Sequence, residues 1–330
     1  MLIVEITLAI FGLILLSAGG YVLVAGGAAL AKRLQISSMV VGLTVVAYGT
    51  STPELAASLT AVFNSHTDLI LGNIVGSNIS NIGMVIGISA MIATGLVIDG
   101  KKRNGLGMRR RVVTRWLPIM IFVSFLMLLL SFDGEISQID GAILVAGLIV
   151  FTIYIVKSAK KQIPVGDVIE SEDPSGDMAI SRFKVNTTPR AIFAVVVGAV
   201  LLFMGGDLTV DGAVNVAEDL GISELVIGVV IVAIGTSLPE LITSVIAIRK
   251  KQMDIGIGNI VGSNIYNILL IGGISATLIG IPVSTDVFSN YYIMIAFSLV
   301  LFIGFRKFIP RFVGIGLAMA FVAYLVSLLV

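Results

Sequence analysis

Two short segments of the sequence carry hydroxyl and acidic side chains in the same order. They read GTSTPE at residues 49–54 and GTSLPE at residues 235–240, so each places a glutamate directly after a proline. A carboxylate beside serine and threonine hydroxyls offers several oxygen ligands, which hard cations such as Na⁺ and Ca²⁺ prefer. The pattern therefore predicts that Glu54 and Glu240 take part in a cation site.

The prolines of these segments are expected to interrupt the helices that carry them. Proline lacks a backbone donor and clashes with the preceding turn, so each helix should break just before Pro53 or Pro239. Backbone carbonyls upstream of such a break can turn toward a cation. The carbonyls predicted to be freed are those of Ala47, Thr50, Ala233 and Thr236.

A structural alternative fits the same residue types. Ser51 and Glu54, like Ser237 and Glu240, have the spacing of a capping box, with proline just inside the helix start. In a soluble protein, helix capping alone would explain this pattern. The location of the glutamates must therefore distinguish the two interpretations.

The composition places both segments in a membrane. Of the 330 residues, 57% are hydrophobic and only 12% are charged, whereas soluble domains carry about 25% charged residues. The absence of cysteine and the single histidine exclude disulfides and sites built on several such ligands. A net charge of +1 gives no basic surface for nucleic acid. We predict an all-α polytopic membrane protein surrounded by the lipid bilayer, with no nucleic-acid partner.

Ten apolar stretches are long enough to cross a bilayer. They fall near residues 3–30, 38–63, 69–97, 112–131, 139–156, 190–215, 223–248, 255–279, 287–305 and 311–329. All 21 lysines and arginines lie in alternate loops of this ten-span chain, namely 32–33, 101–115, 157–190, 249–251 and 306–311. Because such residues accumulate in cytoplasmic loops, we predict a multi-pass protein of the cell membrane with both termini extracellular.

The sequence repeats itself at an offset of 186 residues. Residues 47–90 and 233–276 are identical at 24 of 44 aligned positions, and weaker similarity extends upstream. Each repeat covers five spans, and an odd number places the second copy upside down, as in many secondary transporters. The predicted organisation is a first five-helix repeat (1–156), a flexible cytoplasmic linker (157–189) and an inverted second repeat (190–330), with broken helices 2, 3, 7 and 8.

The repeat places the two glutamates together at the centre of the membrane. Glu54 lies about 15 residues beyond the cytoplasmic end of its span, roughly 23 Å deep at 1.5 Å per residue. Glu240 lies about as deep from the other side, and no Lys, Arg or His is expected at that depth. An unpaired carboxylate there is costly, so a bound cation or proton must neutralise it. This argument favours the ion site over the capping box.

The next span of each half carries a second motif, GNIVGSN, at residues 72–78 and 258–264. Ser77 and Asn81 lie roughly 14 to 20 Å from the outer end of their span, level with Glu54. Small and amide residues also serve helix packing in membranes, which is the alternative interpretation. The recurrence of the whole set in both halves favours a role at the ion site.

These motifs resemble those of the sodium/calcium exchanger family of the cation/calcium antiporter superfamily, whose repeats carry G-T-S-x-P-E and G-N-x-x-G-S-N. The resemblance covers essentially the whole chain and is closest to the prokaryotic type. It implies a set of metal ligands centred on two carboxylates and completed by hydroxyl, amide and carbonyl oxygens. That set is Glu54, Glu240, Thr50, Thr236, Ser51, Ser237, Ser77, Ser263, Asn81, Asn267, Ala47 and Ala233.

The resemblance also implies the activity, which is secondary active antiport of several Na⁺ for one Ca²⁺ by alternating access, with the first and sixth helices sliding. The protein would be no enzyme and would need neither a cofactor nor an obligate protein partner. One departure concerns Asn81 and Asn267, since several relatives have an aspartate at one of these positions. Only two carboxylates then remain, so one Ca²⁺ or two Na⁺ would neutralise the site and a third Na⁺ would make it positive.

Three other functions are compatible with parts of the pattern. The same glutamates could support H⁺/Ca²⁺ exchange, or the site could belong to a passive cation channel. An intramembrane hydrolase using Ser51 or Ser237 is disfavoured, because no His, Lys or Cys is expected at that depth to activate a nucleophile. The leading prediction is an electrogenic Na⁺/Ca²⁺ antiporter.

Overall fold

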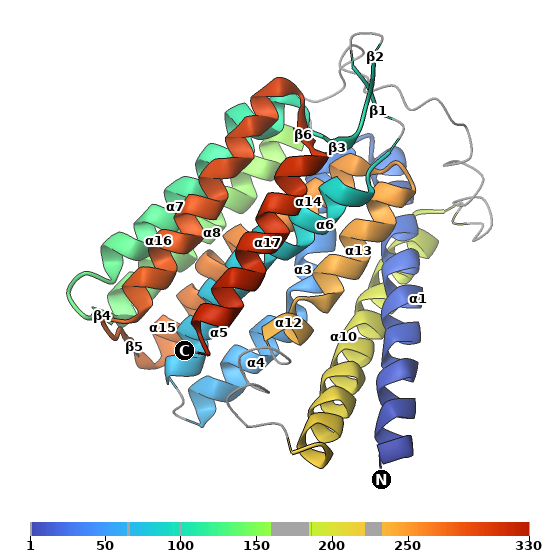
Figure 1. Ribbon diagram of the computed structural model, residues 1–330. Coiled ribbons are helices and arrows are strands. Elements are labelled where there is room, and N and C mark those ends of the chain that lie inside the picture. Colours follow the sequence, from blue (N-terminus) through green and yellow to red (C-terminus); the bar gives the residue numbers. More distant parts are fainter. Residues whose placement is uncertain are drawn as a thin grey trace.

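The computed structural model describes residues 2–64, 67–94, 96–98, 101–159, 185, 187–221 and 233–329, which form a bundle of long helices (Figure 1). The first half contains α1 (Leu2–Leu34), α2 (Ser38–Val41), η1 (Gly42–Val46), α3 (Ala47–Thr50), α4 (Thr52–Phe63), α5 (Thr67–Ser80), η2 (Asn81–Ile86), α6 (Gly87–Ile92), η3 (Val112–Trp116), α7 (Leu117–Leu130) and α8 (Gln138–Ala159). The second half contains α10 (Thr188–Asp219), α12 (Ala233–Thr236), α13 (Leu238–Arg249), α14 (Met253–Tyr266), η5 (Asn267–Gly272), α15 (Gly273–Ile279), α16 (Val287–Val300), η6 (Leu301–Arg306) and α17 (Arg311–Ser327).

Within the described ranges, seven helical segments are long and apolar enough to cross a membrane. Two shorter apolar segments, Ser38–Thr50 and Arg311–Ser327, occupy further predicted windows. The window at 223–248 is described only from Ala233, as α12 and α13. The chain is therefore an all-α polytopic membrane protein, and its helices are consistent with the ten predicted spans. Most of the predicted linker 157–189 lies outside the described residues.

The two halves contain equivalent helices at the offset of the sequence repeat. The bounds of α3, α4, α5 and η2 differ from those of α12, α13, α14 and η5 by 186 residues each. Helix α10 runs antiparallel to α1, since Gly12 lies against Gly205 while Gly26 lies against Ala191. The repeat seen in the sequence is thus a repeat of structure, and the copies of the first helix point in opposite directions.

Helices α1 and α10 approach each other so closely that their backbones touch. Glycines recur every seven residues on both helices, at Gly12, Gly19 and Gly26 and at Gly198, Gly205 and Gly212. A Cβ at Gly205 would lie 2.6 Å from the backbone nitrogen of Leu16, and one at Gly198 would lie 2.6 Å from that of Leu23. Small residues of this kind let membrane helices pack by van der Waals contact, which replaces the hydrophobic effect inside a bilayer. The pair forms one flank of the bundle (Figure 1).

Four helices that were predicted to be broken fall into two groups. In the second span, α3 and α4 are separated at Ser51, and in the seventh, α12 and α13 are separated at Ser237. In the third and eighth spans the chain stays helical throughout Leu69–Ile92 and Met253–Ile279. There the interruption is a change from α to π geometry, which begins at Asn81 and at Asn267. Without a proline, these spans keep a continuous helix, and the wider π turn often marks functional sites.

Short strand pairs join the loops at both ends of the bundle. At one end, β1 (Leu96–Ile98) pairs with β2 (Lys101–Arg103), and β3 (Gly105–Gly107) pairs with β6 (Phe308–Pro310). At the other end, which also holds the start of α1 and the end of α17, β4 (Glu135–Ile136) pairs with β5 (Ile281–Pro282) (Figure 1). All three pairs are antiparallel.

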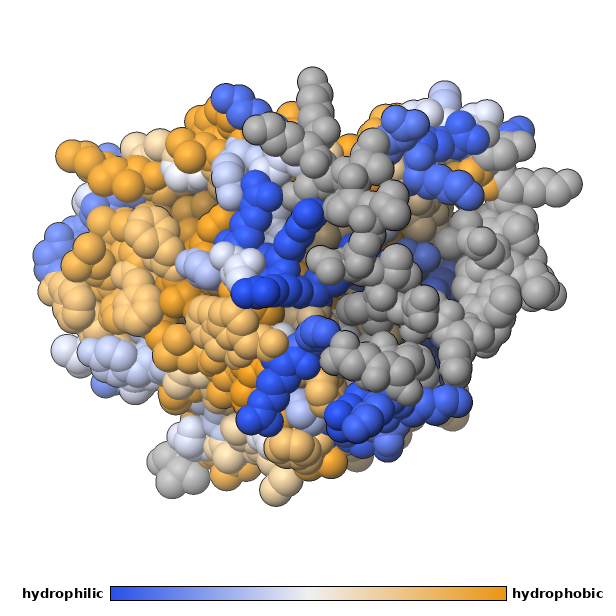
Figure 2. Space-filling model, turned by 90° about the horizontal axis from the view of Figure 1, so that it is seen from above, coloured by the Kyte–Doolittle hydropathy of each residue, from blue (hydrophilic) through white to orange (hydrophobic). Residues whose placement is uncertain are grey.

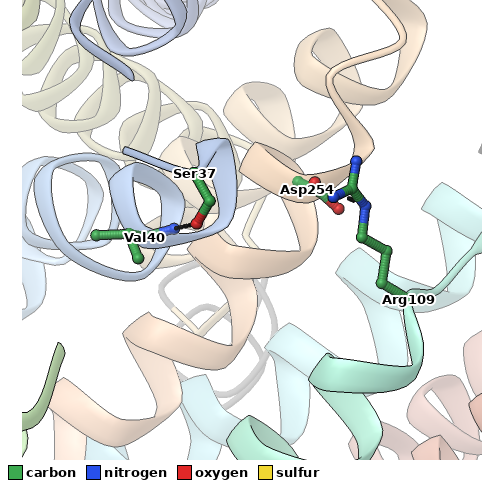
Figure 3. A network of polar contacts seen from close by, with 4 residues as sticks. All are labelled: Ser37, Val40, Arg109 and Asp254. Carbon is green, nitrogen blue, oxygen red and sulfur yellow. Dashed lines mark hydrogen bonds and ion pairs between the residues drawn. The ribbon is translucent and has the colours of Figure 1, made fainter. Parts of the chain in front are cut away.

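The end with β1, β2, β3 and β6 carries many of the basic residues. Figure 2 views this end and shows hydrophilic side chains gathered between apolar ones. Arg109, which follows β3, pairs with Asp254 in the first turn of α14 at 3.1 Å, and Ser37 caps α2 by accepting from the Val40 amide (Figure 3). An acidic residue is favourable at a helix N-terminus, so Asp254 serves both α14 and the ion pair.

The glycine contacts predict a sharp difference between two identical substitutions. Gly205→Ala places a Cβ against the backbone of α1, whereas Gly316→Ala in α17 meets open space. Because an overpacked contact usually costs about 1 to 3 kcal/mol, we expect Gly205→Ala to lower the melting temperature of the detergent-purified protein clearly. Gly316→Ala should leave it unchanged or raise it, since alanine favours helix. Equal melting temperatures of the two variants would contradict the backbone contact.

Candidate ion-binding site

The two interrupted helices bring Glu54 and Glu240 to the centre of the bundle. Ser51 and Ser237 stand at the interruptions, with φ and ψ of −85° and 9° and of −89° and 2°. Pro53 and Pro239 lie in the first turn of the following helix, where proline is well tolerated. Each break thus lies at the serine, slightly before the position predicted from the proline.

The serines at the breaks do not cap the helices that follow them. Neither Ser51 nor Ser237 makes a side-chain capping hydrogen bond. Instead, Ser51 Oγ donates to Oε1 of Glu240 across the repeat interface at 3.1 Å. The capping-box interpretation is therefore wrong for this protein, and the hydroxyl of Ser51 contacts the glutamate of the other half.

Both glutamates are buried beside each other. Their exposed fractions are 1% for Glu54 and 0% for Glu240, and their carboxyl groups lie close enough to interact. Oε1 of Glu240 accepts from Ser51 and, at 3.4 Å, from Ser263. Its Oε2 and both carboxylate oxygens of Glu54 have no hydrogen-bond donor. In the described part of the chain, no ion pair joins either glutamate to a basic residue.

A threonine connects the first break to the eighth span. Thr50 Oγ1 donates to Oδ1 of Asn259 at 2.9 Å and lies 3.5 Å from Oγ of Ser263. The carbonyl of Ala47, predicted to be freed, still accepts from the Ser51 amide at 3.0 Å and faces the Thr50 hydroxyl at 3.3 Å. In the second half, the Ser237 amide bonds to the carbonyl of Ile234 at 3.1 Å, whereas the Ser51 amide bonds to that of Ala47. The two breaks are therefore not equivalent in detail.

The remaining predicted ligands lie on the same helices. Ser77 is buried in α5 and contacts Asn73 at 3.4 Å, and the fully buried Asn81 and Asn267 begin η2 and η5. Ser237 is buried, and its hydroxyl has no hydrogen-bond partner. Thr236 and Ala233 lie in α12, directly before the second break. The structure thus connects Glu240, Thr50, Ser51 and Ser263 through defined contacts, with the carboxylate of Glu54 beside that of Glu240.

Four further residues hold the broken helices against their neighbours. Asn73 Nδ2 donates to Ser58 Oγ at 2.8 Å and to the backbone carbonyl of Glu54 at 3.0 Å. In the other half, Asn259 Nδ2 donates to Ser244 Oγ at 3.1 Å. These residues were not among the predicted site residues, although all four occupy identical positions in the two repeats. That identity, together with their polarity inside a membrane span, was the available signal.

The comparison with known families agrees with the fold. The model of the sodium/calcium exchanger protein family matches residues 4–157 and 190–330. The chain belongs to this family. The two matched regions lie on either side of the segment that was predicted to be the linker.

Individual exchangers and membrane proteins are similar along nearly the whole chain. The sodium/calcium exchanger MaX1 of Methanosarcina acetivorans is 32% identical over 369 residues, which covers 99% of both chains. The inner membrane protein YrbG of Escherichia coli is 30% identical and covers 97% of this chain and 95% of its own. A solved structure of the sodium-calcium exchanger NCX_Mj superposes with a TM-score of 0.79 at 29% identity, covering 99% of this chain and all of the other.

The candidate site contains few charged groups. Among the residues that the structure describes, no three His, Cys, Asp or Glu side chains gather around one point. The charge at the site therefore comes from Glu54 and Glu240, and the other available ligands are neutral oxygens. A donor set of this kind suits hard cations and does not suit soft transition metals.

The contrast between the two break serines is testable in buffer without Na⁺ or Ca²⁺. Hydrogen bonds to a charged group contribute about 1.5 to 3 kcal/mol, so Ser51→Ala should lower the melting temperature of the purified exchanger. Ser237→Ala should have the smaller effect, because the Ser237 hydroxyl has no partner to lose. A larger loss for Ser237→Ala than for Ser51→Ala would contradict the asymmetry.

Proposed function

We propose that this protein is a secondary active antiporter that exchanges Na⁺ for Ca²⁺ across the cell membrane by alternating access. One observation carries the proposal. Two carboxylates from opposite halves of the chain lie side by side, buried, with three of their four oxygens lacking any donor. Such a pair inside a membrane requires a positive partner, and a transported cation supplies it.

We further propose that the predicted ligands form one connected cluster of sites around this pair. The carboxylates would be shared by both ions, with the hydroxyls of Thr50, Ser51, Ser77, Thr236, Ser237 and Ser263, the amides of Asn81 and Asn267 and the carbonyls of Ala47 and Ala233 around them. Hard oxygen ligands of this type bind both Na⁺ and Ca²⁺. The named activities of MaX1 and NCX_Mj support this choice of ions.

Sharing the carboxylates explains why the transport would be an exchange. Ca²⁺ and Na⁺ cannot both occupy the same two carboxylates, so binding of one ion displaces the other. The empty site carries two negative charges in a low-dielectric surrounding, which makes its passage between the two access states costly. Each transfer would therefore be made with an ion bound, and net movement in one direction requires a return movement with the other ion.

The pair of α1 and α10 is the element that we propose to move. Its two helices are interlocked by backbone contacts, while it meets the site through small contacts such as that between Gly206 and the ring of Pro239. Gly49, just before the first break, faces Ala199 of α10 in the same way. A rigid pair that touches both breaks can open the site to either side by sliding along them.

The orientation in the membrane follows from the basic residues. Lys101, Lys102, Arg103, Arg306 and Arg311 lie on or beside β2 and β6, at one end of the bundle. Because basic residues mark cytoplasmic loops, we propose that this end faces the cytoplasm and that both termini are extracellular. Labelling of single cysteines introduced at Glu135 and Lys102, in cells and with a membrane-impermeant reagent, should modify only the former.

The exchange itself is tested by uptake of ⁴⁵Ca²⁺ into proteoliposomes. We expect uptake when the vesicles are loaded with Na⁺ and diluted into Na⁺-free buffer, and none without the Na⁺ gradient. Glu54→Gln and Glu240→Gln should each abolish it, because a neutral amide cannot balance the cation. Glu218→Gln, at the exposed end of α10, is the matched control and should transport normally.

The result also separates the proposal from H⁺/Ca²⁺ exchange through the same glutamates. Uptake driven by a pH gradient alone, with Na⁺ absent on both sides, would replace Na⁺ by H⁺ as the coupling ion. Undiminished Na⁺-driven uptake in both glutamine variants would overturn the assignment of the site. A flux that does not saturate and needs no counter-ion would indicate a channel.

We also propose that the exchange moves net charge. If more than two Na⁺ leave for each Ca²⁺ that enters, positive charge flows out of the vesicle. An inside-positive potential, set with valinomycin and external K⁺, should then accelerate ⁴⁵Ca²⁺ uptake, and an inside-negative potential should slow it. Rates that do not change with the potential would show electroneutral exchange of two Na⁺ for one Ca²⁺.

A further inference from the structure

Four asparagines form a brace between the third and eighth spans. Asn78 and Asn81 come from α5 and η2, Asn264 and Asn267 come from α14 and η5, and all four are at least 99% buried. We infer that Asn78 and Asn264 are positioning residues, each of which orients the amide of an asparagine in the opposite half so that its oxygen remains available to the cation. This inference rests on the proposed ion site.

The orientation of Asn267 is determined by a backbone carbonyl. Asn78 Nδ2 lies 3.2 Å from the carbonyl oxygen of Asn264 and 3.6 Å from Sδ of Met294, and neither atom can donate a hydrogen bond. The amino group of Asn78 must therefore face these two acceptors. Its Oδ1 then points the other way and accepts from Nδ2 of Asn267 at 3.1 Å. The amino group of Asn267 therefore faces Asn78, and the Oδ1 of Asn267 has no donor.

Asn81 is oriented in the same way by Asn264, whose own amide is fixed by the sulfur of Met120. Nδ2 of Asn264 lies 3.6 Å from Sδ of Met120, which accepts but cannot donate. Oδ1 of Asn264 therefore faces Asn81 and accepts from its Nδ2 at 3.0 Å. Oδ1 of Asn81 is buried and, like that of Asn267, has no donor. In each pair of asparagines, a buried acceptor fixes one amide, and the Oδ1 of the other has no donor.

The two asparagines with free oxygens lie one turn beyond serines of the proposed site. The backbone amide of Asn267 donates to the carbonyl of Ser263. Asn267 therefore lies one turn beyond Ser263, whose hydroxyl donates to Glu240. Asn81 lies four residues beyond Ser77 in the equivalent span. Residues one turn apart share a helix face, so Asn267 lies on the face of Ser263, which contacts Glu240, and Asn81 lies on the face of Ser77. Their free oxygens are the ends of the brace that a cation can approach.

The brace matters because an asparagine has two unlike ends. An aspartate presents oxygen to a cation in either orientation, but a rotated asparagine would present its positively polarised amino group. With only two carboxylates in the site, two reversed amides would replace attraction by repulsion next to the ion. Asn78 and Asn264 prevent that rotation, and Met120 and Met294 hold them in turn.

The inference is tested by the apparent KM for Ca²⁺ in Na⁺-driven uptake. Asn78→Leu and Asn264→Leu keep the size of the side chain but remove the acceptor that holds Asn267 or Asn81. Loss of such a supporting contact typically weakens metal binding about 10- to 100-fold. We expect each variant to raise the KM at least about tenfold, with a smaller change in the maximal rate per folded protein. Calorimetric titration of the purified variants with CaCl₂ should show the same loss of affinity.

Two further variants separate positioning from structural damage. Ser298→Ala removes a buried hydroxyl that bonds only to the carbonyl of Met294 in its own helix, and it should leave the KM unchanged. Asn264→Asp keeps an acceptor for the Asn81 amino group, so its KM should not rise. A KM of Asn264→Asp raised as far as that of Asn264→Leu would overturn the inference. So would leucine variants with wild-type KM and a reduced maximal rate.

The outcomes also distinguish this inference from the proposed function. If wild type and Ser298→Ala show no Na⁺-driven uptake, the function itself is wrong. If both transport normally and the leucine variants bind Ca²⁺ with wild-type affinity, only the positioning role fails. Should a leucine variant not fold, the other one, in the opposite half, provides the same comparison.

Discussion

The structure depends on the cost of holding two carboxylates in the middle of a membrane without a basic partner. Each ionised group there loses its hydration, and neither Glu54 nor Glu240 regains it from a lysine or arginine among the described residues. A soluble protein could meet this cost with water, but both side chains are buried. The remaining choices are protonation or a bound metal cation, and the side chains that contact Glu240 offer hydroxyl oxygens.

The surrounding helices distribute hydrogen bonds unequally between the two glutamates. Glu240 receives two hydroxyl donors from Ser51 and Ser263, while Glu54 receives none. A repeated sequence therefore does not give a symmetric site. The difference begins at the breaks, where the Ser51 amide bonds to Ala47 but the Ser237 amide bonds to Ile234. The two carboxylates are therefore unequal as ligands in the proposed site.

Much of this organisation can be predicted from the sequence, because membrane proteins follow strict rules. Span length, alternate basic loops and the 186-residue repeat indicate the helices, their order and the convergence of Glu54 with Glu240. The Pro53 and Pro239 rule correctly predicts interrupted second and seventh spans. It says nothing about the third and eighth, which lack proline and change to π geometry at Asn81 and Asn267 instead.

Such rules do not predict contacts between residues that are distant in the sequence. The capping box of Ser51 and Glu54 is a local sequence pattern. A serine that donates to the glutamate of the other half has the same local sequence, so the pattern does not distinguish the two roles. The sulfur atoms of Met120 and Met294 lie outside the repeated motifs, so no spacing connects them with the asparagines. Side-chain partners across a repeat interface are set by the way the two halves dock, which single-span patterns do not contain.

The glycine contacts between α1 and α10 limit how these two helices can move. Their seven-residue spacing corresponds to about 10.5 Å along a helix, so the glycines come back into register only after a shift of that size. A smaller slip would bring side chains of α10 against the backbone of Leu16 or Leu23, where there is no room even for a Cβ. The glycine contacts therefore hold the two helices in one register. Any smaller displacement must take place where the pair meets the rest of the bundle.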